Sequence, residues 1–381
     1  MPTSAKSGRA TPGHGKSGGA TPGHGKSGRA TPGGAAPSSE RLDSFIAGLP
    51  KAELHVHHVG SASPRVVAEL AARHAGATPV PADPEALADY FAFTDFKHFI
   101  NVYVTVVDLV RTADDVYALT RDVARTLAEQ RVRYAELTVT PYSTVIRGVP
   151  AQEFCAAIEH ARVRAEAEDG LVLRWCFDTP AELGPPAAAA TLEIALAEQP
   201  AGLVSFGLGG AEVGAPRAQF APQFARARAV GLRSAPHAGE SVGPHAVWEA
   251  IDRLGAERIG HGIAAARDRR LLAELRKRQI ALEVCPTSNV CTRAVASLAE
   301  HPLPALVAAG VPVSINSDDP SMFSTTINGE YAVAAELLGL DEAGVAELAR
   351  AAVRQSFLAD AGKASLLAEI DAYCCGRAGP R

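Results

Sequence analysis

Short apolar runs and amphipathic segments alternate along the chain after about residue 38. Runs typical of buried strands occupy 52–59, 132–140, 171–178, 202–208, 232–237, 257–261, 280–285 and 311–316. Segments with helical spacing lie between most of them, at 116–129, 151–168, 187–198, 246–254 and 268–278. Eight strands that alternate with helices predict an α/β fold, and they favour a closed parallel (β/α)8 TIM-type barrel over an open sheet.

Two further segments extend this pattern. A long insert after the first strand, 64–131, has helical character. The aromatic residues of its 90–103 stretch, YFAFTDFKHFINVY, either cap the barrel mouth or pack between helices, and the sequence leaves both interpretations open. The segment from 341 onward is also predicted to be helical.

The N-terminal segment has a different composition. Residues 6–34 carry a ten-residue repeat, KSGRATPGHG, that is rich in Gly, Pro, Ser and Thr and has no aromatic or large aliphatic side chain. Such a segment buries too little apolar surface to offset its chain entropy. We therefore predict a disordered tail at 1–38 and a single barrel domain at 39–381.

Composition narrows the range of functions. The chain has 381 residues, is 47% hydrophobic and carries a net charge of −5, which argues against a general nucleic-acid partner. We find no apolar run long enough to span a bilayer and no signal sequence. Six cysteines without a CxxC pair favour free thiols and a cytoplasmic location. The oligomeric state is not readable.

Polar residues suited to metal chemistry lie at the ends of four of the predicted strands. They are His55, His57, His237, Glu240, His261, Asp318 and Asp319. Taken singly, each has an ordinary explanation: a chance histidine pair, a carboxylate at a helix N-terminus, a buried histidine or an acidic turn. Together they would meet at the mouth of a barrel, where histidines and a carboxylate suit a divalent metal that activates water.

These residues lie in motifs that resemble the adenosine deaminase family of the amidohydrolase superfamily. The matching stretches are ELHVHHVGS, SFGLGGAE, PHAGE, ERIGHG, LEVCPTSN and SINSDDP, spread over about 40–360. The resemblance implies a barrel with one catalytic zinc ion. It also implies a small-molecule nucleoside substrate whose adenine ring loses its 6-amino group to water and releases ammonia.

The resemblance also assigns roles to individual residues. The zinc ligands would be His55, His57, His237 and Asp318. Glu240 would protonate purine N1, and His261 would orient the attacking water, help to deprotonate it and stabilise its charge. In the substrate pocket, Asp319 would hold N7, the backbone N–H of Gly210 would bind N3, and His57 and Val59 would contact the substrate.

Val59 is the main departure from the family pattern, which has Asp at this position to accept a hydrogen bond from the ribose 5′-hydroxyl. Many adenosine deaminases also carry Arg near Thr138. An apolar wall suits a branch of the family that deaminates aminodeoxyfutalosine, an intermediate of menaquinone synthesis with a benzoate group on its 5′ side. We therefore expect this substrate, with Arg147 or His58 as a cation for the benzoate. Adenosine is the alternative.

Three other interpretations remain open. Adenine ranks below adenosine, because adenine deaminases usually have an acid in place of Val59. A purine-binding protein without activity would lack catalytic residues, but here all are present. An amidohydrolase with another reaction, such as amide or lactone hydrolysis, often has two metals bridged by a carboxylated lysine at the end of strand four, where SFGLGGAE has no lysine. Cys285 is interpreted as a packing residue and neither a nucleophile nor a ligand.

Overall fold

Eight parallel strands form the centre of the molecule. The computed structural model describes residues 39–377, and its strands lie in the order β1 to β8 in one sheet. They are β1 Lys51–His57, β2 Val132–Val139, β3 Val172–Phe177, β4 Leu203–Leu208, β5 Arg233–Ala238, β6 Arg258–His261, β7 Ala281–Val284 and β8 Val313–Ile315.

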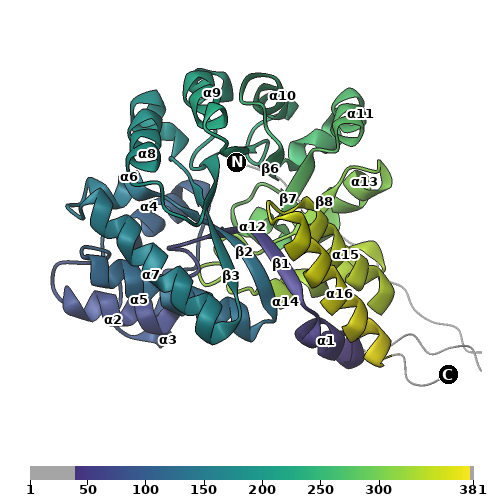
Figure 1. Cartoon of the computed structure of the whole chain (residues 1–381), viewed down its shortest axis with the longest axis horizontal. Coiled ribbons are helices and arrows are strands. Elements are labelled where there is room, and N and C mark those ends of the chain that lie inside the picture. The colour runs from purple at the N-terminus through teal and green to yellow at the C-terminus, as the bar shows by residue number, and fades with distance from the viewer. Residues whose placement is uncertain (1–38, 378–381) are drawn as a thin grey trace, which may run out of the picture. The chain divides into compact units, whose positions relative to one another are not determined.

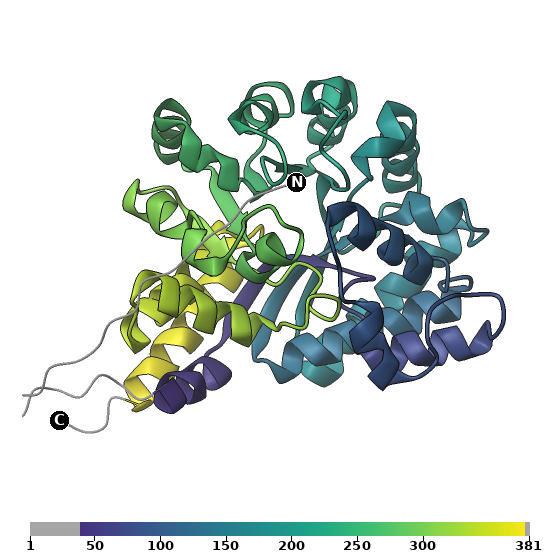
Figure 2. The ribbon, with the colours of Figure 1, turned by 180° about the vertical axis from the view of Figure 1, so that it is seen from behind.

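Helices surround these strands on the outside, as opposite views show (Figures 1 and 2). The α-helices of the described chain are α1 Ser39–Gly48, α2 Pro64–Arg73, α3 Pro84–Tyr90, α4 Phe96–Val107, α5 Ala113–Glu129, α6 Pro141–Val145, α7 Ala151–Asp169, α8 Gly184–Glu198, α9 Ala221–Ala229, α10 Pro244–Arg253, α11 Arg269–Arg278, α12 Pro286–Cys291, α13 Leu303–Ala308, α14 Ile327–Leu338, α15 Glu342–Gln355 and α16 Asp360–Arg377. Short 3-10 turns are η1 Ala181–Leu183, η2 Arg217–Phe220, η3 Ile263–Arg267 and η4 Leu298–Glu300.

The last strand returns to the first and closes the sheet. A parallel bridge joins Val56 to Asp318, just beyond β8. The Asp318 N–H donates to the His55 carbonyl at 3.0 Å, and the His57 N–H donates to the Asp318 carbonyl at 2.8 Å. The predicted (β/α)8 barrel is confirmed, and each predicted strand overlaps the observed one.

The alternation of side chains along β1 places its functional residues. Leu54 and Val56 belong to the hydrophobic core, whereas His55 and His57 point to the opposite side of the strand. Side chains two residues apart share a face of a strand, so the period of the strand itself brings the two imidazoles together.

The insert between β1 and β2 is helical, as predicted, and contains α2 to α5. Its last helix begins with a capping box, in which Thr112 and Asp115 satisfy each other's backbone N–H groups. Among the described residues, none of the helices is sufficiently long and apolar to cross a membrane. The predicted tail at 1–38 lies outside the described residues, and so do residues 378–381.

Candidate active site

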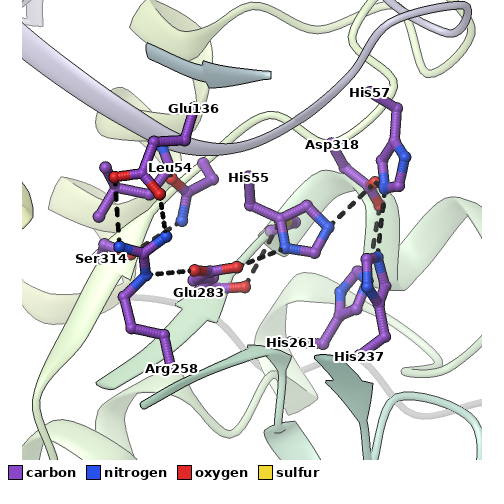
Figure 3. A network of polar contacts seen from close by, with 12 residues as sticks. Leu54, His55, His57, Glu136, His237, Arg258, His261, Glu283, Ser314 and Asp318 are labelled. Atoms are coloured by element: carbon purple, nitrogen blue, oxygen red, sulfur yellow. Dashed lines mark hydrogen bonds and ion pairs between the residues drawn. The ribbon is translucent and has the colours of Figure 1, made fainter. Parts of the chain in front are cut away.

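The polar residues of four strand ends meet at the carboxyl-terminal mouth of the barrel. Figure 3 shows His55 and His57 from β1, His237 from β5, His261 from β6 and Asp318 from beyond β8. Segments far apart in the sequence therefore meet here, because parallel strands end at the same side of a barrel.

Four of these residues have the spacing of ligands around one metal ion. One ligand atom from each of His55, His57, His237 and Asp318 lies within 4.8 Å of the others. His57 Nε2 lies 3.2 Å from His237 Nε2 and 3.2 Å from Asp318 Oδ1, and His55 Nε2 lies 3.5 Å from the same oxygen. Tetrahedral bonds of about 2.0–2.1 Å separate ligand atoms by about 3.4 Å.

The polar atoms of this cluster also fit a cation. The buried nitrogen His55 Nε2, which faces Asp318, has no hydrogen-bond partner among the described residues. Burial alone would lower the pKa of His55, but the contacts with Asp318 and Glu283 raise it to about 10. The carboxylates therefore favour positive charge here, which a divalent metal would supply.

A buried ion-pair relay lies behind His55, and sequence reasoning did not find it. His55 Nδ1 lies 3.0 Å from Glu283 Oε2, and Arg258 Nε donates to Glu283 Oε1 at 2.6 Å. Arg258 also pairs with Glu136, at the far side of the guanidinium (Figure 3). Since a carboxylate only accepts, His55 carries its proton on Nδ1 and leaves Nε2 free for a metal.

Glu240 and His261 lie beside the metal cluster and not in it. His261 Nε2 is 3.7 Å from Glu240 Oε2 and 3.8 Å from Asp318 Oδ2. Burial, followed by the charge of Asp318, raises the pKa of Glu240 to about 8, so this carboxyl is an acid near neutral pH. Burial lowers the pKa of His261 to about 3 and keeps its ring neutral.

The loop that carries Glu240 is held by a second carboxylate, Glu212 of the GLGGAE motif. Glu212 accepts hydrogen bonds from the backbone N–H groups of Gly239, Glu240, Ser241 and Val242, at 2.6 to 3.2 Å. These bonds fix the turn after β5 before any substrate arrives, which is the arrangement that preorganised catalysis requires.

Two glycines leave the space that the site needs. A Cβ on Gly60 would overlap Asp319 Oδ1, and a Cβ on Gly260 would lie 2.7 Å from His55 Cε1 and 3.0 Å from His237 Cγ. The small residues of the HHVGS and IGHG motifs are therefore required by the neighbouring side chains. His261 and Asp318 themselves have positive φ, 56° and 64°, a strained conformation typical of functional sites.

Asp319 is buried beside the metal cluster, and its Oδ1 has no partner among the described residues. Burial raises the pKa of Asp319, and the neighbouring charge of Asp318 adds to this rise. A protonated Asp319 would be a donor, which matches an acceptor atom on a ligand. The N–H of Gly210 likewise makes no hydrogen bond among the described residues.

An open pocket leads from these residues to the surface, with an empty volume of about 980 Å³ that includes space open to solvent. Phe96, Phe99, Ile100 and Tyr103 of α4 form one apolar wall. The aromatic stretch thus serves in both predicted ways, because Phe99 also packs against Phe323 with ring centroids 5.0 Å apart.

The pocket lining also includes Val59, Thr138 and one arginine. Arg147 is the only arginine or lysine among the residues that line this pocket. Its Nε donates to Asp108 at 2.5 Å and its Nη1 to the Ser143 carbonyl at 2.7 Å. Its side chain remains 23% exposed, so a ligand can reach it.

His58 does not have the properties expected of a cation. Its Nε2 lies 2.8 Å from the Thr120 hydroxyl, which donates to the Val116 carbonyl, so His58 is the donor. Burial lowers its pKa to about 3. The expectation that His58 meets a substrate carboxylate is therefore wrong.

Cys285 is fully buried and its thiol contacts the Glu283 carbonyl at 3.6 Å.

Comparison with known proteins identifies the family. The model of the family described as adenosine deaminase matches residues 50–373. The chain belongs to the adenosine deaminase family. This family is metal-dependent, in agreement with the His/Asp cluster at the barrel mouth.

Individual members of the family are highly similar to the chain. It is 62% identical over 340 residues to an aminodeoxyfutalosine deaminase of Streptomyces avermitilis, covering 89% of this chain and 95% of the relative. It is 63% identical over 334 residues to that of Streptomyces coelicolor, covering 87% and 86%. The crystal structure of an adenine deaminase from Arthrobacter aurescens is 33% identical, with a TM-score of 0.82, covering 86% and 99%.

Proposed function

We propose that the protein is a zinc-dependent aminodeoxyfutalosine deaminase. It would hydrolyse the 6-amino group of the adenine ring and yield futalosine and ammonia, a step of menaquinone synthesis. The observation that carries this proposal is the identity of 62% and 63% to two aminodeoxyfutalosine deaminases over most of the chain. The cytoplasmic location and the absence of nucleic-acid and membrane partners stay predictions.

In this proposal, zinc is held by His55, His57, His237 and Asp318. Three imidazoles and one carboxylate are ligands typical of this metal, and the spacing of their atoms suits it. When bound, zinc makes hydroxide available near neutral pH. Glu283 and Arg258 keep His55 in the orientation and tautomer that binding requires.

The remaining residues would bind and polarise the purine. Glu240 is an acid near neutral pH and gives a proton to N1, which makes C6 more electrophilic. Asp319, in its protonated form, donates to N7, and the free N–H of Gly210 donates to N3. His57 lies in the pocket wall and also contacts the substrate.

The 5′ side of the substrate would lie along α4. Val59 offers an apolar surface where a hydroxyl acceptor is found in adenosine deaminases, and Phe96 and Tyr103 also line this pocket. Arg147 lines the same pocket and would pair with the benzoate. Adenosine, the alternative substrate, has a 5′-hydroxyl that Val59 leaves without a partner, which costs about 1–3 kcal/mol when the group is buried.

The test is a comparison of ammonia release from aminodeoxyfutalosine, adenosine, 5′-deoxyadenosine and adenine by zinc-loaded protein. We expect the largest kcat/KM for aminodeoxyfutalosine. A larger kcat/KM for adenosine would overturn the proposed substrate and indicate an enzyme of purine salvage. Zinc binding without deamination of any of the four would overturn the enzyme itself in favour of a purine-binding protein.

The role of Arg147 has its own test. Arg147→Ala should raise KM for aminodeoxyfutalosine by about 10-fold, because a charge-assisted hydrogen bond is lost. The same variant should leave KM for 5′-deoxyadenosine unchanged, because this compound has no carboxylate. Asp108→Asn is the matched control: it removes the carboxylate that competes for Arg147 and should not raise KM. An unchanged KM in Arg147→Ala would exclude this assignment.

A further inference from the structure

A chain of hydrogen bonds runs behind His261, away from the pocket. Asn289 Nδ2 lies 3.1 Å from His261 Nδ1, and Asn289 Oδ1 lies 3.1 Å from His301 Nε2. His301 Nδ1 in turn accepts from the backbone N–H of Leu303 at 3.1 Å. His261, Asn289 and His301 are all buried, with at most 4% of each exposed.

The backbone group at the end of this chain sets the direction of every bond in it. A backbone N–H is always a donor, so His301 accepts on Nδ1 and carries its proton on Nε2. This proton needs an acceptor, which is the oxygen of the Asn289 amide. The NH2 end of that amide must then face His261, so Nδ1 of His261 accepts and its single proton sits on Nε2.

We propose that Asn289 and His301 are positioning residues that hold His261 as a neutral Nε2–H donor throughout the reaction. In this tautomer His261 orients the attacking water and stabilises its charge but takes no proton from it, because Nε2 has no free lone pair. The inference rests on the proposed function, and it narrows the role that the family resemblance implies for His261.

The surroundings of Nε2 agree with a donor. Oxygens of the Glu240 and Asp318 carboxyl groups lie 3.7 and 3.8 Å from Nε2, and a water between them and the ring would receive the Nε2–H. The bond between Asn289 Nδ2 and His261 Nδ1, at 3.1 Å, holds the ring so that Nε2 faces these two carboxyl groups.

Glu240 then accounts for the protons of the reaction. Glu240 gives its proton to N1 as the water oxygen bonds to C6, and it recovers one proton from that water. The second water proton leaves with the amino group as ammonia when the C6–N bond breaks. The ring keeps the proton on N1 and gains the C6 oxygen, and Glu240 ends protonated as it began.

The direct test is the ¹⁵N NMR spectrum of the zinc-loaded protein with labelled histidine. We expect His261 to show a protonated Nε2 and an unprotonated Nδ1, with an assignment from His261→Gln. A His261 with its proton on Nδ1 would overturn the proposal. This measurement needs no turnover, so it is separate from the test of the substrate.

Asn289→Asp is the matching functional variant. A carboxylate of the same size accepts from both neighbours, so it moves the His261 proton to Nδ1. We expect kcat to fall by about 100-fold, as when one preorganised donor is removed, with little change in KM. Asn328→Asp adds the same charge on α14, outside the pocket, and should leave kcat unchanged. A reversed tautomer with normal kcat would also overturn the proposal.

Discussion

At the scale of single residues, Val59 is the residue that we propose to face the 5′ side of the substrate. It follows His57 in the turn after β1, lines the pocket and packs against the hydrophobic core. Its neighbour Gly60 leaves the space that the Asp319 side chain occupies, so in our proposal this turn shapes both the 5′ side and the purine side of the pocket.

Val59→Asp should therefore shift the substrate preference toward adenosine. A carboxylate restores an acceptor for the 5′-hydroxyl, worth about 1–3 kcal/mol, and repels a benzoate. We expect kcat/KM for adenosine to rise by about 10-fold and that for aminodeoxyfutalosine to fall. Val59→Leu keeps the wall apolar and is the control. If kcat/KM fell for both substrates in Val59→Asp but not in Val59→Leu, this result would count against the proposed role of Val59.

Glu240 predicts the pH dependence of the reaction. Burial, followed by the charge of Asp318, raises its pKa to about 8, so the acid form is present below this pH and is lost above it. We expect kcat/KM to be level near neutral pH and to fall about 10-fold per unit above pH 8. The measurement is a pH–rate profile, and a rate that rises through pH 8 would contradict the acid role.

At the scale of elements, the relay from β6 and β7 to β1 positions a metal ligand from behind. Arg258 lies between Glu136 and Glu283, and Glu136 also accepts the Phe357 N–H at 2.7 Å. The orientation of His55 thus depends on residues of three strands and on the segment after α15.

Glu283→Gln tests this relay, because the amide keeps its size but loses the charge that holds the His55 proton. We expect zinc affinity to fall by about 10- to 100-fold, measured by competition with a chelator. Asp169→Asn removes a carboxylate from the distant Arg121 pair and is the matched control. If folded Glu283→Gln protein bound zinc as tightly as the wild type, the relay would have no role in zinc binding.

The sequence predicted the strands well because each is a short apolar run beside an amphipathic helix, a local signal. The candidate ligands were predictable because they follow such runs. The roles of Asn289, His301 and Glu283 could not be predicted in the same way. Each depends on a contact with a residue that is distant in the sequence or that lies in a loop. Asp178 was also missed, although it follows β3 directly and lines the pocket; its place after a strand was the signal.

At the scale of the whole molecule, the metal cluster lies on the seam that closes the barrel. His55 and His57 come from the first strand, and Asp318 follows the last one and is bonded to both through the backbone. A bound metal would therefore join the two ends of the sheet as well as serve catalysis.

Removal of the metal should for this reason lower stability. We expect a chelator to reduce Tm and added zinc to restore it, with about 2.7 kcal/mol regained at about 100 times Kd. Scanning calorimetry of the two forms measures the difference. His55→Ala should have a Tm that does not respond to zinc. An unchanged Tm in fully zinc-free wild type would contradict the coupling.

The position of this seam also bears on how the protein is made. The two histidines of β1 are translated early, whereas Asp318 is translated after all eight strands. The complete set of candidate ligands therefore forms only after β8 has been synthesised and the first strand has paired with the last. If these residues hold the metal, a complete site can form only late in folding, after the barrel has closed.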